Sequence, residues 1–148
     1  MCSLSMRSLC WALFLLMPLI TITSCDDPTG PKEERKIGVI AFYSDPVVIT
    51  VPDTVLLGDP FSVSVRTYGD GCVSEDGTEV ESTSLSFQIT PYDVLTLGRG
   101  VICPAIVRHF DHTATLTATQ SGTAQITFHG RQLPGELPIS EIREVVVK

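Results

Sequence analysis

The residues best suited to catalysis or metal binding lie together at 109–112. His109, Asp111 and His112 are of the types that bind metal ions or, with a serine, form a hydrolytic triad. On a continuous strand His109 and His112 would point to opposite faces, so a shared metal requires a turn over 110–113. The chain's third histidine, His129, is distant in sequence, and no G-x-S-x-G is present. A small metal-dependent or hydrolytic enzyme is therefore an alternative hypothesis.

An acidic stretch at 70–81 is the second candidate site. It carries five carboxylates and no basic residue, and carboxylate oxygens are the ligands that Ca²⁺ prefers. Its spacing matches no D-x-D-x-D-G loop. We expect a solvated loop or hairpin, with a Ca²⁺ site or an acidic docking surface as the alternatives. The five residues are Asp70, Glu75, Asp76, Glu79 and Glu81.

Positions 1–24 predict an export signal. They begin with one basic residue, Arg7, and no acid, and continue with an uncharged apolar run over 9–22 that contains Pro18. At about 1.5 Å per residue this run covers roughly 21 Å, which is short of the ~30 Å hydrocarbon core of a bilayer. A short basic region followed by a short apolar region is typical of a signal peptide rather than a membrane-spanning helix.

The apolar run ends in Ile22-Thr23-Ser24-Cys25, which is an aliphatic residue, two small residues and a cysteine. This resembles the lipobox of bacterial lipoproteins. The resemblance implies a diacylglyceryl thioether on Cys25, cleavage before it and acylation of the new N-terminus. Several acyl chains hold a protein firmly on a bilayer. We expect membrane anchoring on the exported side of a bacterial envelope, in either membrane. The alternative is a soluble exported protein with an ordinary cleavage site.

Segment 25–36 is predicted to be a lipidated flexible tether. Residues 26–36 read DDPTGPKEERK and contain no large apolar side chain, so they cannot bury enough surface to offset the entropy of ordering. A single helical turn over 31–36 is the alternative. We therefore expect three parts: the signal peptide at 1–24, the tether at 25–36 and one folded domain at 37–148.

Composition limits the function of that domain. The 148 residues have a net charge of −7 and a sequence pI near 4.8, which argues against a nucleic-acid groove. With 43% hydrophobic and 18% charged residues, the chain is not disordered. Much of its positive mean hydropathy, +0.26, comes from the predicted signal.

Apolar and polar residues alternate from position 37 onward, which predicts antiparallel strands with one buried face. No stretch of a dozen residues has helical apolar spacing. Seven or eight strands joined by Gly, Asp and Pro turns predict an all-β sandwich of the immunoglobulin type. The alternating segments are 61–66, 84–89, 113–119 and 124–129, and further strands are expected at 47–51, 101–110, 139–147 and 37–43.

Two segments resemble bacterial Ig-like domains. The stretch 51–65, with Gly58-Asp59 in a turn, is similar to their first hairpin, and Ser121-Gly122-Thr123-Ala124 begins a strand similar to one near their end. The resemblance implies a fold and no active site. It departs from antibody domains because Trp11, the only tryptophan, lies in the signal.

Cys72 and Cys103 are the two cysteines left after Cys2 and Cys10 leave with the signal and Cys25 takes lipid. An even pair in an exported domain predicts a disulfide. A redox or metal-binding pair is the alternative.

The leading functional hypothesis is a lipid-anchored envelope protein with a non-catalytic Ig-like binding or structural module. It predicts no cofactor, leaves the small-molecule ligand unidentified and allows an envelope protein as partner. The third hypothesis is an assembly subunit that pairs through an edge strand.

Overall fold

The computed structural model describes residues 30–148 of the chain. The predicted signal, the lipobox and Cys25 lie outside the described residues. Within 30–148 no helix is long and apolar enough to cross a membrane. The described chain is all-β, as its alternating pattern predicts.

The described residues form ten strands, more than the seven or eight predicted, because Lys32–Ile37, Thr54–Val55 and Val73–Ser82 are strands as well. The ten strands are β1 (Lys32–Ile37), β2 (Val39–Phe42), β3 (Ile49–Thr50), β4 (Thr54–Val55), β5 (Pro60–Gly69), β6 (Val73–Ser82), β7 (Ser86–Leu97), β8 (Arg108–Thr117), β9 (Gly122–Leu133) and β10 (Leu137–Val147).

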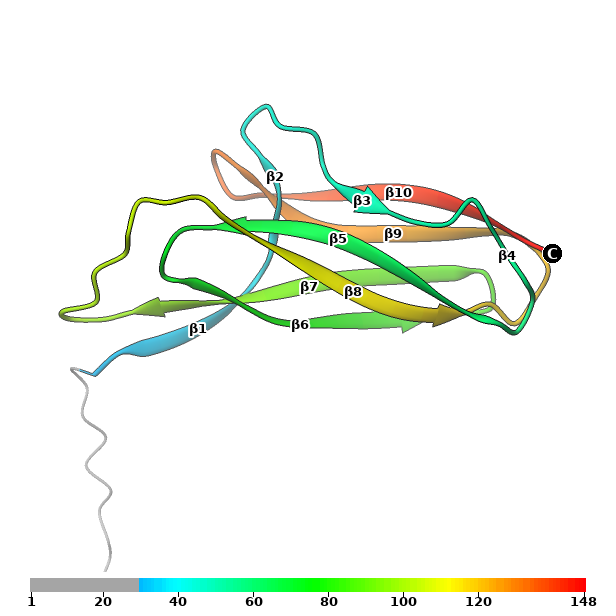
Figure 1. Ribbon diagram of the computed structural model, residues 1–148, viewed down its shortest axis with the longest axis horizontal. Coiled ribbons are helices and arrows are strands. Elements are labelled where there is room, and N and C mark those ends of the chain that lie inside the picture. Colours follow the sequence, from blue (N-terminus) through cyan, green and yellow to red (C-terminus); the bar gives the residue numbers. More distant parts are fainter. Residues whose placement is uncertain (1–29) are drawn as a thin grey trace, which may run out of the picture.

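The strands form one continuous sheet that curls until its two parts face each other (Figure 1). One part consists of β5 with β8 and β3 paired to it, all antiparallel. The other runs β6, β7, β9, β10 and β4, with β7 and β9 parallel. β1 pairs with the second half of β7, beyond the segment of β7 that pairs with β9.

β2 joins the two parts of the sheet. It pairs parallel to the end of β9 and contacts β5 through Val39 opposite Tyr68. Ile40, which is fully buried, packs directly against Gly130 of β9. A Cβ at position 130 would lie about 2.5 Å from the Ile40 side chain, so the missing side chain of Gly130 allows this crossing.

The core lies between the two parts and follows from the alternation in the sequence. Phe61 of β5 meets Phe87 of β7 edge to face, with 6.1 Å between ring centroids. On β5, β8 and β9 the inward positions are buried while their neighbours are exposed or half-buried, as expected where one face of a sheet is covered. Other fully buried members of this core are Ile89, Ala118, Ala124, Ile126, Phe128 and Val145.

Two predicted boundaries are wrong. The strand expected at 101–110 begins only at Arg108, because Cys103 is bonded to Cys72 and the carbonyl of Pro104 accepts a bond from the N–H of Gly71. The tether is also shorter than expected, because Lys32–Ile37 form β1 and pair with β7 over six positions.

Of the two structures expected for the acidic stretch, a loop or a hairpin, the structure has the hairpin, formed by β6 and β7. Glu75, Asp76, Glu79 and Glu81 lie on β6, at an edge of the sheet where β6 pairs with β7. Charged side chains on an edge strand discourage pairing with another chain. Two of these carboxylates have a local partner in Arg35 of β1.

Candidate functional site

A cleft of about 290 Å³ lies beside β1 and the segment that precedes β8. Residues of β1, β2, β5, β6, β7 and β9 and of the segment 105–107 line it. Its size is near the lower limit for small-molecule sites. The residues that line it are Lys36, Val39, Phe42, Tyr68, Gly69, Asp70, Val73, Asp93, Leu95, Ala105, Ile106, Val107, Arg131, Leu133 and Glu136.

The walls of the cleft are mainly apolar. Phe42 and Tyr68 stack with their ring centroids 5.4 Å apart and come from adjacent strands. Leu95 and Val107 contribute aliphatic surface from β7 and from the segment before β8. Apolar walls of this kind remove water from the nonpolar part of a ligand.

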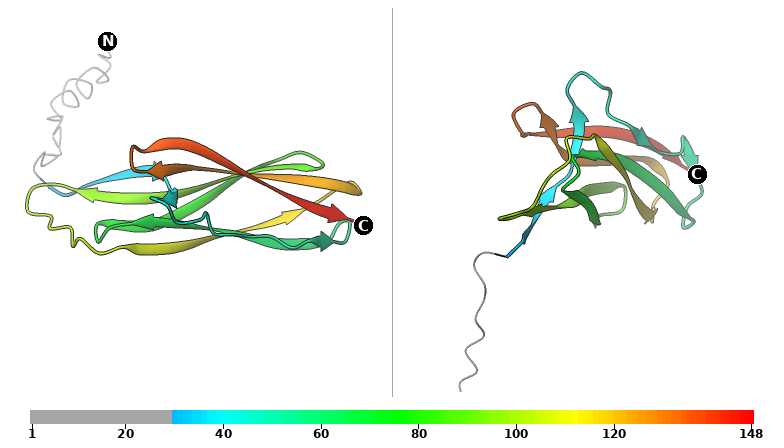
Figure 2. Two further views of the ribbon diagram at one scale, coloured as in Figure 1. Left: turned by 90° about the horizontal axis from the view of Figure 1, so that it is seen from above. Right: turned by 60° about the vertical axis from the view of Figure 1, so that its left-hand side comes forward.

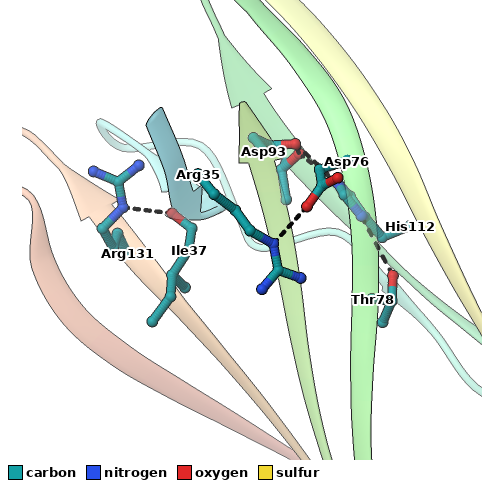
Figure 3. Close-up of polar contacts among 8 residues, drawn as sticks. Arg35, Ile37, Asp76, Thr78, Asp93, His112 and Arg131 are labelled. Carbon is teal, nitrogen blue, oxygen red and sulfur yellow. Dashed lines mark hydrogen bonds and ion pairs between the residues drawn. The ribbon is translucent and has the colours of Figure 1, made fainter. Parts of the chain in front are cut away.

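Arg131 is held in a fixed position at the cleft. Its Nε donates to the carbonyl of Ile37 at 2.5 Å (Figure 3). Its Nη1 lies 3.0 Å from a carboxylate oxygen of Glu136. Lys36 of β1 also lines the cleft, with its Nζ 3.6 Å from Glu34. These cations give the cleft polar groups that can orient the charged or polar end of a ligand.

A buried polar cluster of Asp93, His112 and Thr67 lies behind the cleft. Asp93 lines the cleft, and its Oδ1 lies 3.0 Å from His112 Nε2 and 3.2 Å from the hydroxyl of Thr67. The His112 side chain is fully buried. His112 Nε2 also lies 3.1 Å from the Thr67 hydroxyl oxygen, and Nδ1 contacts the Thr78 hydroxyl at 3.4 Å (Figure 3).

The structure separates the predicted histidines. β8 pairs with β5 in an unbroken register through this region, so alternate side chains point to opposite faces. His112 is buried in the polar cluster, whereas His109 and Asp111 are exposed. Asp111 forms a two-point pair with Arg66, at 2.8 and 3.1 Å, and the hydrogen bonds from Arg66 lower the pKa of the Asp111 carboxyl.

The acidic residues do not meet at one point either. Arg35 lies across Tyr92 of β7, 3.6 Å from the ring centroid, and contacts Asp76 at 2.5 Å and Glu79 at 2.8 Å. Hydrogen bonds to Glu79 and then Asp76 raise the pKa of Arg35, and burial raises the pKa of the Tyr92 phenol. These two carboxylates stabilise the β1–β7–β6 face.

Asp70 lies apart from β6, at the mouth of the cleft beside the disulfide. Its Oδ1 accepts from the N–H of Cys72 at 2.8 Å. Cys72 and Cys103 are joined with their Cα atoms 5.0 Å apart. The three side chains come within metal-binding distance of one another, but the sulfurs are bonded to each other and are not thiolate ligands.

Sequence reasoning missed Asp93, Thr67 and Arg131. A signal for the first two was present, because the inward row of β7 continues from Phe87 and Ile89 to Asp93, and that of β5 ends at Thr67. A polar residue at the end of an inward apolar row indicates where apolar packing ends and buried hydrogen bonds begin. Nothing in the sequence indicated Arg131, since its position at the cleft depends on β2 crossing to β9.

No protein-family model, curated protein or solved structure matches this chain.

Proposed function

We propose that this protein is a bacterial envelope lipoprotein, anchored through Cys25, whose single Ig-like β-sandwich is a non-catalytic binding module. The cleft takes a mainly apolar ligand with a polar end, because its lining carries the cations Lys36 and Arg131 together with carboxylates of Asp70, Asp93 and Glu136. The apolar part of such a ligand lies against Phe42, Tyr68 and Leu95, and its polar end faces Lys36 and Arg131.

The observation that carries this proposal is the composition of the cleft. Aromatic and aliphatic walls and a few fixed charged groups are what small-molecule binding sites share. The stacked pair of Phe42 and Tyr68 is held by the β2–β5 contact, so this part of the wall is formed without a ligand. A preformed wall costs little ordering on binding.

The lining also supports a binding role over catalysis. Among the described residues that line the cleft, none is a serine, threonine, cysteine or histidine. His112 reaches Asp93 from the core side, and its side chain has no exposed surface to offer a substrate. A general base must reach the proton that it removes.

The Ig-like character of the fold is part of the same proposal. Two facing parts of a sheet around an apolar core, built by hairpins such as β6–β7 and β9–β10, support it. The disulfide lies at one end of the fold and does not cross the core between the two parts, in contrast to the bridge of antibody domains.

The anchor is tested by Cys25→Ser in the producing bacterium. We expect loss of metabolic labelling with an acyl-chain precursor and release of the protein from the membrane fraction. A variant that is labelled and retained like wild type would contradict the anchor.

The cleft is tested by native mass spectrometry of the full chain released from mild detergent. We expect wild type to retain a small co-purified molecule and Val107→Asp to lose it, because the carboxylate replaces apolar wall. Leu56→Asp is the matched control, since Leu56 is 60% exposed, like Val107 at 61%, and is not part of the lining. Equal retention by both variants, or no bound molecule in wild type, would contradict the proposal.

A further inference from the structure

The loop 98–107 between β7 and β8, which we name the apolar loop, differs from the rest of this acidic chain. Its sequence is GRGVICPAIV, with one base and no acid in a protein of net charge −7. Ile102 is 88% exposed, Val107 61% and Ile106 55%. Single exposed aliphatic residues are ordinary, whereas several in one short loop mark an interaction surface.

The apolar loop is fixed to the fold at its middle. Cys103 is bonded to Cys72, and the N–H of Gly71 donates to the carbonyl of Pro104 at 3.1 Å. Gly71 lies so close to Pro104 that a Cβ there would come within about 2.5 Å of the proline ring. These contacts hold the loop while Ile102 points into solvent, so its exposure is built into the structure.

The apolar loop starts beside the point where the described chain begins. A Cβ on Gly98 would lie 3.0 Å from the Cα of Pro31 and 3.1 Å from the carbonyl oxygen of Gly30. Both views in Figure 2 place this loop and the start of β1 at the same end of the molecule, with the C-terminus at the other end.

The short distance in sequence from Gly30 to Cys25 limits how far the loop can be from an anchored N-terminus. Five residues span at most about 18 Å when fully extended. If Cys25 carries lipid in the bilayer surface, Gly30 and the adjacent start of the apolar loop lie within about that distance of the headgroups.

We propose that the apolar loop is a second membrane contact, in which Ile102 enters the lipid surface and Arg99 faces anionic headgroups. This inference rests on the proposed anchoring through Cys25. Aliphatic side chains gain from burial in the boundary between headgroups and acyl chains, and a basic residue there is attracted to anionic lipid. Two carboxylates of the acidic β6, Asp76 and Glu79, are paired with Arg35, which offsets their repulsion from anionic headgroups.

This contact fixes the orientation of the domain relative to the membrane surface. A flexible anchor alone allows the domain to rotate freely, whereas an anchor and a loop at the same end hold that end down. The cleft is lined by Ala105, Ile106 and Val107 of the same loop, so it opens next to the lipid surface. A mainly apolar ligand can then reach it from the bilayer.

The test places a single fluorescent reporter on the loop. Trp11 is the chain's only tryptophan, and it lies in the segment that the proposed cleavage before Cys25 removes. The substitution Ile102→Trp therefore gives mature protein with one tryptophan, at a position so exposed that folding is not affected. The full chain is produced with its own signal, purified in detergent and placed in phosphatidylethanolamine and phosphatidylglycerol vesicles with brominated acyl chains.

We expect the emission of the Ile102→Trp protein to shift to shorter wavelength and to fall about twofold or more by bromine quenching. The control is Leu56→Trp, because Leu56 is also well exposed and lies near the C-terminal residue Lys148, whose carbonyl accepts from the N–H of Leu57. Its emission should show neither change.

Flotation of the same vesicles separates this inference from the proposed anchor. If the protein floats with vesicles but the reporter at position 102 is quenched no more than the one at 56, the loop contact is wrong and the anchor stands. A shift without quenching would mean that a second copy or another protein covers the loop, which also overturns the inference. If acyl labelling and flotation both fail, the anchor is wrong and the inference falls with it.

Discussion

The two ends of this molecule use the same inward rows of side chains in opposite ways. At the end near the C-terminus the rows carry Phe61, Phe87 and Leu116, which pack into a dry apolar core. At the end near Gly30 the same strands carry Thr67, Asp93 and His112, which are buried but hydrogen-bonded to each other. The end near the C-terminus is therefore packed with apolar side chains. The end near Gly30 has buried polar side chains in their place, next to the cleft and the apolar loop.

The largest expected effect tests the apolar end. Phe87 is 1% exposed and contacts Phe61 edge to face, so Phe87→Ala should lower the free energy of unfolding by about 3–5 kcal/mol through lost burial and a new cavity. Urea denaturation measures it. Leu56→Ala, at a position 60% exposed, should change it by less than about 0.5 kcal/mol. An equal decrease in the free energy of unfolding for the two variants would contradict an apolar core that stabilises this end of the molecule.

The next effect tests what holds the apolar loop. The Cys72–Cys103 bond spans 31 residues, so Cys72→Ser with Cys103→Ser should cost about 3–4 kcal/mol in the chain-entropy model. Hydrogen exchange should also rise in 98–107 while the β9–β10 hairpin keeps its protection. Uniform loss of protection over both regions would show that the bond supports the whole fold instead.

A smaller effect tests the buried polar cluster. Asp93→Ala removes the buried carboxylate that bonds both Thr67 and His112 and should cost about 1–3 kcal/mol, because the hydroxyl and the ring nitrogen are left with only each other as partners. Replacing the cluster by Thr67→Val, Asp93→Leu and His112→Leu together should recover much of that loss, since no polar group is then unpaired. A triple variant less stable than Asp93→Ala would show that the cluster itself stabilises this end.

The smallest expected change in the free energy of unfolding comes from an ion pair on the outer face of β5 and β8. Arg66 and Asp111 are direct partners on β5 and β8 and are more exposed than the cluster behind them. Because Arg66 lowers the pKa of folded Asp111, the stability from this pair is present above pH about 4 and is lost as the pH falls through the folded pKa. Asp111→Asn should thus be slightly less stable than wild type at pH 7. The two should converge in strong acid, and a gap that persists there would contradict the assignment.

The sequence predicted most of the strands because alternation directly reports burial on one face. It did not predict the strand at Lys32–Ile37, and it left the acidic stretch open between a loop and a hairpin, because both are charged segments whose order depends on partners. Arg35 reaches Asp76 and Glu79 across Tyr92, and no local pattern shows that these residues are neighbours. Charged segments that complement each other can form strands that neither would form alone.

The candidate site was less predictable than the fold. The histidines and acids that the sequence singled out are separated by the strand register, whereas the cleft collects residues such as Tyr68, Leu95 and Arg131 that are ordinary in sequence. Their proximity follows from β2 crossing between β9 and β5, a long-range arrangement. Only Asp93 and Thr67, at the ends of apolar rows, were detectable from pattern alone.

The antiparallel pairing of β1 with β7 also has a mechanical consequence. β1 is the first strand after the predicted anchor, and it pairs with β7 over six consecutive positions. A pull on the N-terminus along the strand axis loads all of these backbone hydrogen bonds at once, in shear, instead of opening them one after another. Force between the membrane and a bound partner would therefore meet resistance at β1 before it reached the core.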